Sequence, residues 1–334
     1  MQLKPIQDQV VVVLGASSGI GRESARQLAS RGAKVVVAAR SGPGLDSLVR
    51  EIKEAGGEAT AVICDATDFA QVERVAEIAV EAYGRIDTWV NVCAVAGYAS
   101  FEDTSLEDLR QIFDVNVMGY VHGARAALPH LRREGRGALI SIASVESNVA
   151  IPLHSHYAAT KHAIEGLMDG LRRELMADGA PISVTTIKPG SINTPFFTNA
   201  MNKLTVKPQG PPPIYQPSVV AECVVYAAEH PVRDLYAGGA ARMMALTQML
   251  APGLMDRMLS RAGIPAQETD DTATGNVTGN LYEPSNDDRV EGDFSDQASA
   301  FSPYTWLQTH PAAKMAVIGG AIVGIGAVLS RGDD

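Results

Sequence analysis

The stretch that decides the fold lies near the N-terminus and reads Val10-Val11-Val12-Val13-Leu14-Gly15-Ala16-Ser17-Ser18-Gly19-Ile20-Gly21. Its continuous apolar run predicts a strand that is buried on both faces of a parallel sheet. A helical pattern over 22–30 follows the glycine-rich turn, and a second apolar strand covers 34–39. Strand, turn, helix and strand form a βαβ unit of about thirty residues. In such a unit the glycines let a pyrophosphate approach the free N–H groups at the helix N-terminus.

Short apolar runs and helical patterns continue to alternate after this unit. Further strands are predicted at 58–63, 88–92, 138–144, 183–187 and 233–237. Further helices are predicted at 45–55, 69–83, 106–131, 155–176, 218–229 and 240–259. This alternation predicts an α/β fold, a doubly wound parallel sheet of the Rossmann type, in a single domain over residues 1–262.

The alternation is interrupted between Ser191 and Pro217. This segment is apolar and rich in proline, and it has no clear helical or strand period. A segment of this kind after a strand is more often a lid or binding loop than a core element. Its composition favours an apolar small-molecule substrate.

The negative charge is concentrated in one segment near the C-terminus. The chain has a net charge of -10, and residues 267–297 contain nine acidic side chains and only Arg289 as a basic one. The rest of the chain is nearly neutral and has no basic run, which argues against nucleic acid as a partner. Because the acidic segment has few large apolar residues, we expect 263–303 to be a flexible linker, at most laid along the body.

A second group of residues indicates chemistry on a carbonyl. Ser144 ends an apolar strand, and Tyr157 and Lys161 are four residues apart, so they share one face of the following helix. A serine hydroxyl can hold a carbonyl oxygen while a tyrosine supplies a proton. A nearby lysine ammonium favours the ionised phenol. The alternative is a helix that carries an ordinary surface tyrosine and lysine.

Together these motifs resemble the short-chain dehydrogenase/reductase family. The matching positions, in chain order, are Gly15-x-x-x-Gly19-x-Gly21, Asn91, Asn116, Ser144, Tyr157-x-x-x-Lys161 and Pro189-Gly190-x-x-x-Thr194. The resemblance covers roughly residues 8–240. The chain departs from the family pattern at Leu14, where threonine is usual, and at 92–94, where the family usually continues Asn-Ala-Gly.

The resemblance implies a set of cofactor-binding residues. The pyrophosphate would lie against Gly15, Ser17, Ser18, Gly19, Ile20 and Gly21. Asp65 would bind the adenine, Asn91 would lie along a ribose, and Tyr157 with Lys161 would bind the nicotinamide ribose. The carboxamide would contact Pro189, Gly190 and Thr194.

The resemblance also implies the catalytic set and an activity. Ser144 would polarise the carbonyl, Tyr157 would be the general acid/base, Lys161 would tune Tyr157, and Asn116 would hold a water that links Lys161 to solvent. The expected function is an oxidoreductase that interconverts an alcohol and a carbonyl compound, in a homo-oligomer. The alternative is a catalytically inactive nucleotide-binding scaffold or membrane-tethered regulator with the same fold.

The end of the second strand bears on the choice of cofactor. Relatives that prefer NAD tend to carry an aspartate at the position of Ala39, where its carboxylate binds the ribose hydroxyls and repels a 2′-phosphate. Here that acid is absent and Arg40 follows. An arginine can bind a phosphate with two parallel hydrogen bonds and stack on adenine. We therefore expect NADP (NADPH), with NAD as the less favoured cofactor.

Polar residues near the tyrosine suggest other sites, which we consider weaker. His154, His156 and His162 lie beside Tyr157 in sequence, but no metal-ligand spacing accompanies them. We interpret them as helix-start and surface residues and expect no metal. Glu146 is interpreted as a solvated acid in a loop, and a contact with the substrate is the alternative.

The C-terminal region 304–334 is predicted to be an apolar helix. Residues 315–330 contain no charged side chain and lie between Lys314 and Arg331. A helix that starts at Pro311 would reach about 30 Å, enough for a hydrocarbon core. We therefore expect a membrane anchor over 311–330, with a cytoplasmic catalytic body because no signal sequence is apparent. A buried or partner-binding helix is the alternative.

Overall fold

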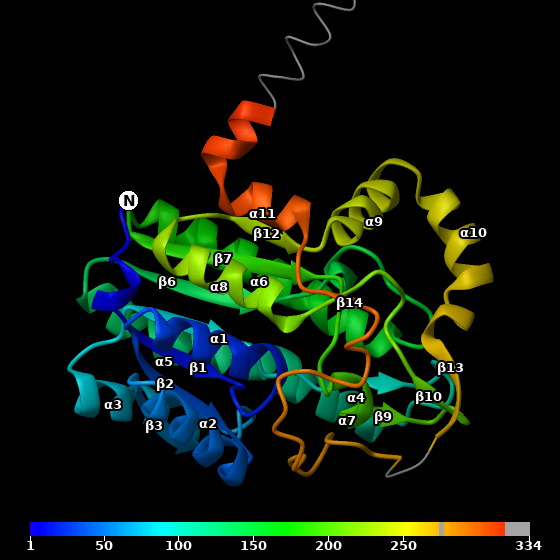
Figure 1. Cartoon of the computed structure of the whole chain (residues 1–334), viewed down its shortest axis with the longest axis horizontal. Coiled ribbons are helices and arrows are strands. Elements are labelled where there is room, and N and C mark those ends of the chain that lie inside the picture. The colour runs from blue at the N-terminus through cyan, green and yellow to red at the C-terminus, as the bar shows by residue number, and fades with distance from the viewer. Residues whose placement is uncertain (274–276, 318–334) are drawn as a thin grey trace, which may run out of the picture.

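A seven-stranded, wholly parallel sheet forms the centre of the computed structural model, which describes residues 1–273 and 277–317. The strand order is β12-β7-β6-β4-β1-β2-β3 (Figure 1). The strands are β1 (Val10–Leu14), β2 (Lys34–Ala39), β3 (Glu58–Ile63), β4 (Thr88–Asn91), β6 (Gly137–Ile142), β7 (Ile182–Pro189) and β12 (Asp234–Ala237). The doubly wound sheet expected from the sequence is confirmed.

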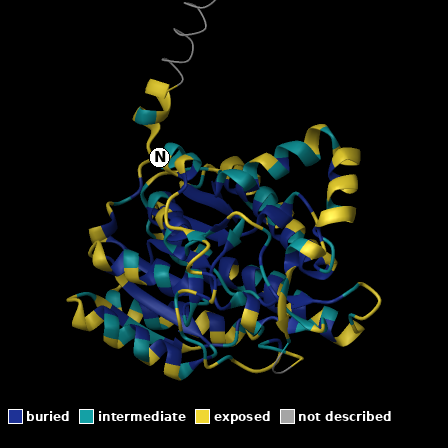
Figure 2. Cartoon of the chain, turned by 45° about the vertical axis from the view of Figure 1, so that its right-hand side comes forward, coloured by how far each residue is buried: buried dark blue, intermediate teal, exposed yellow. Residues whose placement is uncertain are grey.

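Helices cover both faces of this sheet, because alternate residues of each strand point to opposite sides. Val11 and Val13 pack against α1 (Gly19–Ser30), α2 (Gly42–Glu54) and α8 (Pro217–Glu229). Val12 and Leu14 pack against α3 (Phe69–Tyr83), α5 (Gly119–Arg133) and α6 (Ser155–Ala177). Figure 2 shows buried residues concentrated in the sheet and exposed ones on the outer faces of the helices. The strand order reverses between β1 and β4, and open α/β sheets bind ligands at the carboxyl ends of the strands beside such a reversal.

Two helices predicted as continuous are interrupted. The region predicted at 106–131 contains α4 (Leu106–Phe113), a π-helical turn over Asp114–Met118, and then α5. The region predicted at 240–259 is divided into α9 (Gly239–Leu250) and α10 (Pro252–Ala262). The second break has a simple cause, because a proline has no N–H to continue α9 and is well suited to begin a new helix.

The segment from 191 to 217 folds into short pieces on top of the sheet. They are β8 (Ser191–Ile192), α7 (Phe196–Asn199), β9 (Met201–Asn202), β10 (Val206–Pro208) and β11 (Ile214–Tyr215). Strand β9 pairs with β5 (Gly97–Tyr98), which follows β4 in the chain. These pairings place the segment over the carboxyl ends of the strands, as expected for a binding loop.

The acidic segment, expected to be a linker, is laid along the body and attached to it. Strand β13 (Glu268–Thr272) pairs with β10, and β14 (Ala298–Ser299) pairs with β11. Leu281 and Phe294 are buried. Ion pairs such as that between Lys207 and Asp293 and side-chain hydrogen bonds such as that from Tyr282 to Asp108 add to this attachment, and composition alone does not indicate such partners. The proposed boundary at 262/263 therefore does not separate a detached linker from the catalytic body.

The following helix α11 (Pro303–Thr309) also docks on the body. The Thr305 hydroxyl accepts a hydrogen bond from the Gly238 N–H at 2.9 Å. The Gln308 side-chain amide donates to the Tyr236 carbonyl at 2.8 Å. The expected single helix over 304–334 is therefore interrupted at His310, and a new helical stretch starts at 311, as the sequence predicted.

The predicted membrane anchor lies mainly outside the described residues, which end at Val317. Within 1–273 and 277–317, no helix has both the length and the apolar character needed to cross a bilayer. The anchor therefore stays a prediction from the uncharged run 315–330.

Fractionation tests this prediction. We expect the full chain to require detergent for extraction, because the uncharged run would bury in lipid. A shortened chain that ends at His310 keeps α11 docked and should stay in the soluble fraction. Recovery of both chains in the soluble fraction without detergent, and without aggregation, would show that the anchor does not exist.

Candidate active site

The glycine turn after β1 has a conformation that side chains would prevent. Gly15 has φ +103°, and a Cβ atom there would lie 2.4 Å from the backbone nitrogen of Cys93. A Cβ atom on Gly21 would lie 2.0 Å from the carbonyl oxygen of Gly15. The turn therefore packs backbone against backbone at the N-terminus of α1. This is the geometry that a dinucleotide pyrophosphate requires.

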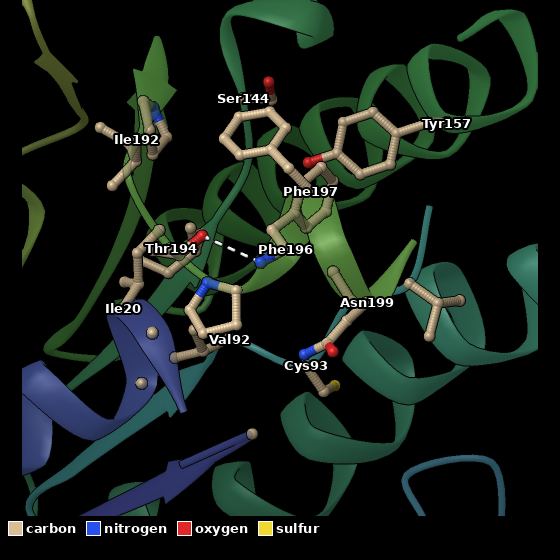
Figure 3. Close-up of a pocket in the computed structure, with 18 of the residues that line it drawn as sticks. Ile20, Val92, Cys93, Ser144, Tyr157, Ile192, Thr194, Phe196, Phe197 and Asn199 are labelled. Atoms are coloured by element: carbon tan, nitrogen blue, oxygen red, sulfur yellow. Dashed lines mark hydrogen bonds between the residues drawn. The ribbon is translucent and has the colours of Figure 1, made fainter. Parts of the chain in front are cut away.

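A cavity of about 290 Å³ extends from this turn across the carboxyl ends of the strands (Figure 3). It brings together fourteen of the predicted site residues: Gly15, Ser17, Ser18, Gly19, Ile20, Gly21, Arg40, Asp65, Ser144, Tyr157, Lys161, Pro189, Gly190 and Thr194. The Thr194 hydroxyl accepts from the Phe196 N–H at 3.4 Å, which fixes the start of α7 at the cavity wall. The cavity also exposes apolar side chains of the binding loop, among them Ile192, Phe196 and Phe197 (Figure 3).

Asn91 does not reach the cavity, contrary to the expected role beside a ribose. Its side-chain oxygen accepts from the Trp89 indole at 2.8 Å, and it packs directly under Gly123 of α5. The reason is the alternation along β4, which turns Asn91 toward the helix layer. The next residues, Val92, Cys93 and Ala94, line the cavity instead.

Asn116 lies beside the cavity wall and is held by its own side-chain hydrogen bonds. It is fully buried on the π-helical turn, where its oxygen accepts from the Val95 N–H at 2.8 Å. Its amide donates to the Val95 carbonyl at 2.8 Å and to the Thr160 hydroxyl at 3.1 Å. In this structure Asn116 braces the loop after β4 against α6 at Thr160, the residue before Lys161. Its role in holding a water stays a prediction.

Ser144, Tyr157 and Lys161 converge at one end of the cavity. Figure 3 shows the Tyr157 ring projecting from α6 toward the side where Ser144 lies. The Lys161 ammonium lies 5.4 Å from the centroid of the Tyr157 ring and donates to the Ile142 carbonyl at 2.9 Å. Ser144, Tyr157 and Lys161 are all buried. The convergence expected from sequence is therefore present.

Burial dominates the acid–base character of this group. It raises the pKa of Tyr157 above its ordinary value, and the Glu146 charge adds to this, while a hydrogen bond with Ser144 acts in the opposite direction. Burial lowers the pKa of Lys161 to about 8, so the ammonium is still largely charged near neutrality. Burial therefore raises the pKa of Tyr157, where the sequence led us to expect that Lys161 would lower it.

Three residues interpreted as solvent-facing are corrected by the structure. Glu146 and His154 are each 5% exposed, and His154 Nδ1 lies 3.0 Å from Glu146 Oε1. His156 is buried as well, with Nε2 at 2.9 Å from the Gly97 carbonyl. The described residues contain no cluster of three or more potential metal ligands. The sequence signal for Glu146 and His154 was their closeness in sequence to the predicted catalytic residues. Glu146 is two residues after Ser144, and His154 is three residues before Tyr157.

The C-terminal segment contributes to the other end of the cavity, which sequence reasoning missed. We call residues 277–297 the strap. Arg40 donates to the carbonyls of Asn280 at 2.6 Å and Tyr282 at 2.9 Å. The Gly19 N–H donates to the Arg289 carbonyl at 3.0 Å. Strap residues Asn280, Pro284, Ser285 and Asp287 line the cavity beside the glycine turn. No sequence motif in the strap indicated that it lies beside the cavity.

Comparisons with known proteins agree with the fold and the site. Residues 9–205 match the family model for short chain dehydrogenase. An uncharacterized oxidoreductase of Bacillus subtilis, YxnA, is 38% identical over 324 residues, which is 96% of this chain and 91% of that protein. An actinorhodin polyketide ketoreductase solved with NADPH is 28% identical, with a TM-score of 0.63, over 71% of this chain and 99% of that one. A short chain dehydrogenase from Mycobacterium paratuberculosis bound to NAD is 26% identical, with a TM-score of 0.63, over 70% and 97%.

The chain belongs to the short-chain dehydrogenase/reductase family, and it is an oxidoreductase. The match to the Bacillus protein covers nearly the whole chain, so it extends well beyond the part that the family model describes.

Proposed function

We propose that this protein is an NADP-dependent oxidoreductase that interconverts an alcohol and a carbonyl compound, with Tyr157 as general acid/base. The observation that carries the proposal is one continuous cavity. The backbone cradle of the glycine turn lies at one end, and the Ser144, Tyr157 and Lys161 side chains lie at the other. The cradle suits a dinucleotide because its backbone folds back on itself so tightly that a Cβ atom on Gly15 or Gly21 would clash with the backbone of Cys93 or Gly15.

The roles of the side chains follow from their chemistry and position. A bound nicotinamide cofactor would supply or accept the hydride. In the reducing direction the Ser144 hydroxyl would hold the carbonyl oxygen while Tyr157 donates its proton to that oxygen. Lys161 would stabilise the phenolate left behind, because its ammonium is still largely charged near neutral pH. The surrounding aromatic side chains, Phe196 and Phe197, would exclude water from the reacting carbon.

A substrate screen tests this function. NADPH oxidation is measured across a panel of aldehydes, ketones and quinones with apolar frameworks. We expect turnover of some members, because the proton donor and the apolar wall lie in the same cavity. Tight binding of the cofactor without turnover of any member would favour the inactive scaffold.

Arg40 supports NADP as the preferred cofactor. It lines the cavity at the end of β2, and its two strap partners are neutral carbonyls, which leave the guanidinium charge available to a 2′-phosphate. We expect kcat/KM for NADPH to exceed that for NADH by about tenfold or more, a difference of about 1.4 kcal/mol.

The Arg40→Ala variant should lose most of this preference. The matched control is Arg26→Ala, because Arg26 is half-exposed on α1 and pairs with Glu23 and Glu51. It should keep the wild-type ratio. Equal kcat/KM for the two cofactors in the wild type would overturn the proposal for NADP.

A further inference from the structure

Three polar side chains beside Tyr157 have buried atoms without a hydrogen-bond partner. These atoms are Glu146 Oε2, His154 Nε2 and the Tyr98 hydroxyl oxygen, for each of which the described residues supply no partner. All three side chains line the cavity. Tyr98 is fully buried, and Glu146 and His154 nearly so. Buried polar groups are normally paired, so three unpaired ones in a single cavity require an explanation.

The three side chains are held as one cluster. Glu146 follows β6, His154 precedes α6, and Tyr98 lies on β5. The His154 and Glu146 side chains are in hydrogen-bond contact at 3.0 Å. The Tyr98 and His154 rings pack edge to face, with centroids 4.3 Å apart, and the centroids of the His154 and Tyr157 rings are 5.9 Å apart. The cluster therefore lies next to Tyr157, the proposed proton donor.

The hydrogen-bonding capacity of the cluster selects a ligand group. When His154 Nδ1–H donates to Glu146, the free atoms are two acceptors, Oε2 and Nε2, together with a Tyr98 hydroxyl that can donate or accept. A carboxylate would be repelled by Glu146. A substrate ammonium would have to enter an apolar cavity that already contains the Lys161 ammonium. A hydroxyl is neutral and can donate to Glu146 while it accepts from Tyr98.

We propose that Glu146, His154 and Tyr98 bind a hydroxyl group of the substrate, so that the substrate is an otherwise apolar carbonyl compound with a hydroxyl away from the reacting carbon. This inference rests on the proposed function and restricts the proposed substrates to carbonyl compounds that also carry a hydroxyl. A site built to pair with a hydroxyl discriminates strongly against the analogue that lacks it, because its own polar atoms then stay unpaired.

Matched pairs of compounds test the inference. The probes are cyclohexanone and 4-hydroxycyclohexanone, 2-decalone and 6-hydroxy-2-decalone, and acetophenone and 4′-hydroxyacetophenone. Each is tested for NADPH-dependent turnover and, with NADP present, for the thermal shift that it induces. For at least one framework we expect kcat/KM of the hydroxyl-bearing member to be higher by about tenfold or more, mainly through a lower KM.

Two variants connect this preference to the cluster. Tyr98→Phe removes only a hydroxyl that has no partner, so we expect an unchanged or higher melting temperature together with a lost preference. Glu146→Gln replaces one of the two carboxylate oxygens by an NH₂ group of similar size. This variant should also reduce the preference. The matched control is Tyr236→Phe, whose hydroxyl bonds Asn148 outside the cavity and which should keep the preference.

The outcomes separate this inference from the proposed function. Turnover without preference for the hydroxyl-bearing member of any pair would overturn the inference and leave the function standing. A preference that persists in Tyr98→Phe would also overturn it. Selective binding of hydroxyl-bearing members without turnover would support the hydroxyl-binding site and contradict the proposed oxidoreductase function. Equal thermal shifts within every pair, without turnover, would overturn both.

Discussion

Replacing Tyr157 by Phe is expected to abolish nearly all turnover, by about 100-fold or more, which corresponds to about 2.7 kcal/mol of barrier. The variant keeps the ring, which packs against Phe196 at a centroid distance of 5.6 Å, and removes only the phenolic proton. The glycine turn is untouched, so the dissociation constant for NADPH should change little. The measurements are kcat with the best compound of the substrate screen and a fluorescence titration of NADPH.

A control variant separates the loss of the proton from general damage. Tyr226→Phe makes the same chemical change on α8, where Tyr226 stacks on His230 away from the cavity. It should retain the activity of the wild type. Retention of more than about a tenth of kcat in Tyr157→Phe would show that another group supplies the proton.

Replacing Gly21 by Ala is expected to remove cofactor binding, with NADPH affinity lower by about 100-fold or more. The added methyl group would lie 2.0 Å from the Gly15 carbonyl oxygen, and backbone on both sides prevents easy relaxation. The turn must therefore open, which moves the N–H groups that face the pyrophosphate. NADPH titration and thermal melting measure the two consequences.

Gly253→Ala is the matched control for this substitution. Gly253 lies in the first turn of α10, and a Cβ atom there would meet no atom within 4 Å. The control should bind NADPH as the wild type does and melt at the same or a slightly higher temperature. A folded Gly21→Ala variant with wild-type affinity would contradict the assignment of this turn to the pyrophosphate.

The sheet was predictable because a strand that is buried on both faces appears in the sequence as a continuous apolar run. Runs such as 10–14 and 35–39 are apolar throughout because helices cover both sides of the sheet. The residues at the ends of these strands could be placed in one site for the same reason, since parallel strands deliver their carboxyl ends to one edge. Ser144 and Thr194 follow such strands, and both line the cavity.

Side-chain orientation near the strand ends was harder to predict. Asn91 faces α5 because successive side chains along a strand point to opposite sides of the sheet. An error of one residue in the expected position therefore moves a side chain from the cavity to the core. The π-helical turn around Asn116 has a comparable origin. It adds a residue to one turn, and its residues Asp114–Met118 include no glycine or proline that would indicate this.

Long-range packing accounts for the remaining failures. Glu146 and His154 looked like solvated residues because their packing partners are distant in sequence. Tyr98, which packs on His154, lies more than fifty positions earlier in the chain. The strap looked like a linker because the residues that it contacts, such as Asp108 for Tyr282 and Lys207 for Asp293, lie far away in sequence. Its carbonyls at Asn280 and Tyr282 bind Arg40 from about 240 positions away.

The most direct test of the central claim is the stoichiometry of a single reaction in the wild-type protein and in Tyr157→Phe. NADPH consumption is followed by its absorbance, and the alcohol product is quantified by chromatography in the same sample. One alcohol formed for each NADPH consumed by the wild type, and almost none by Tyr157→Phe, is the result that we predict. NADPH that stays bound and unoxidised with every carbonyl compound, or equal product from both proteins, would contradict the claim.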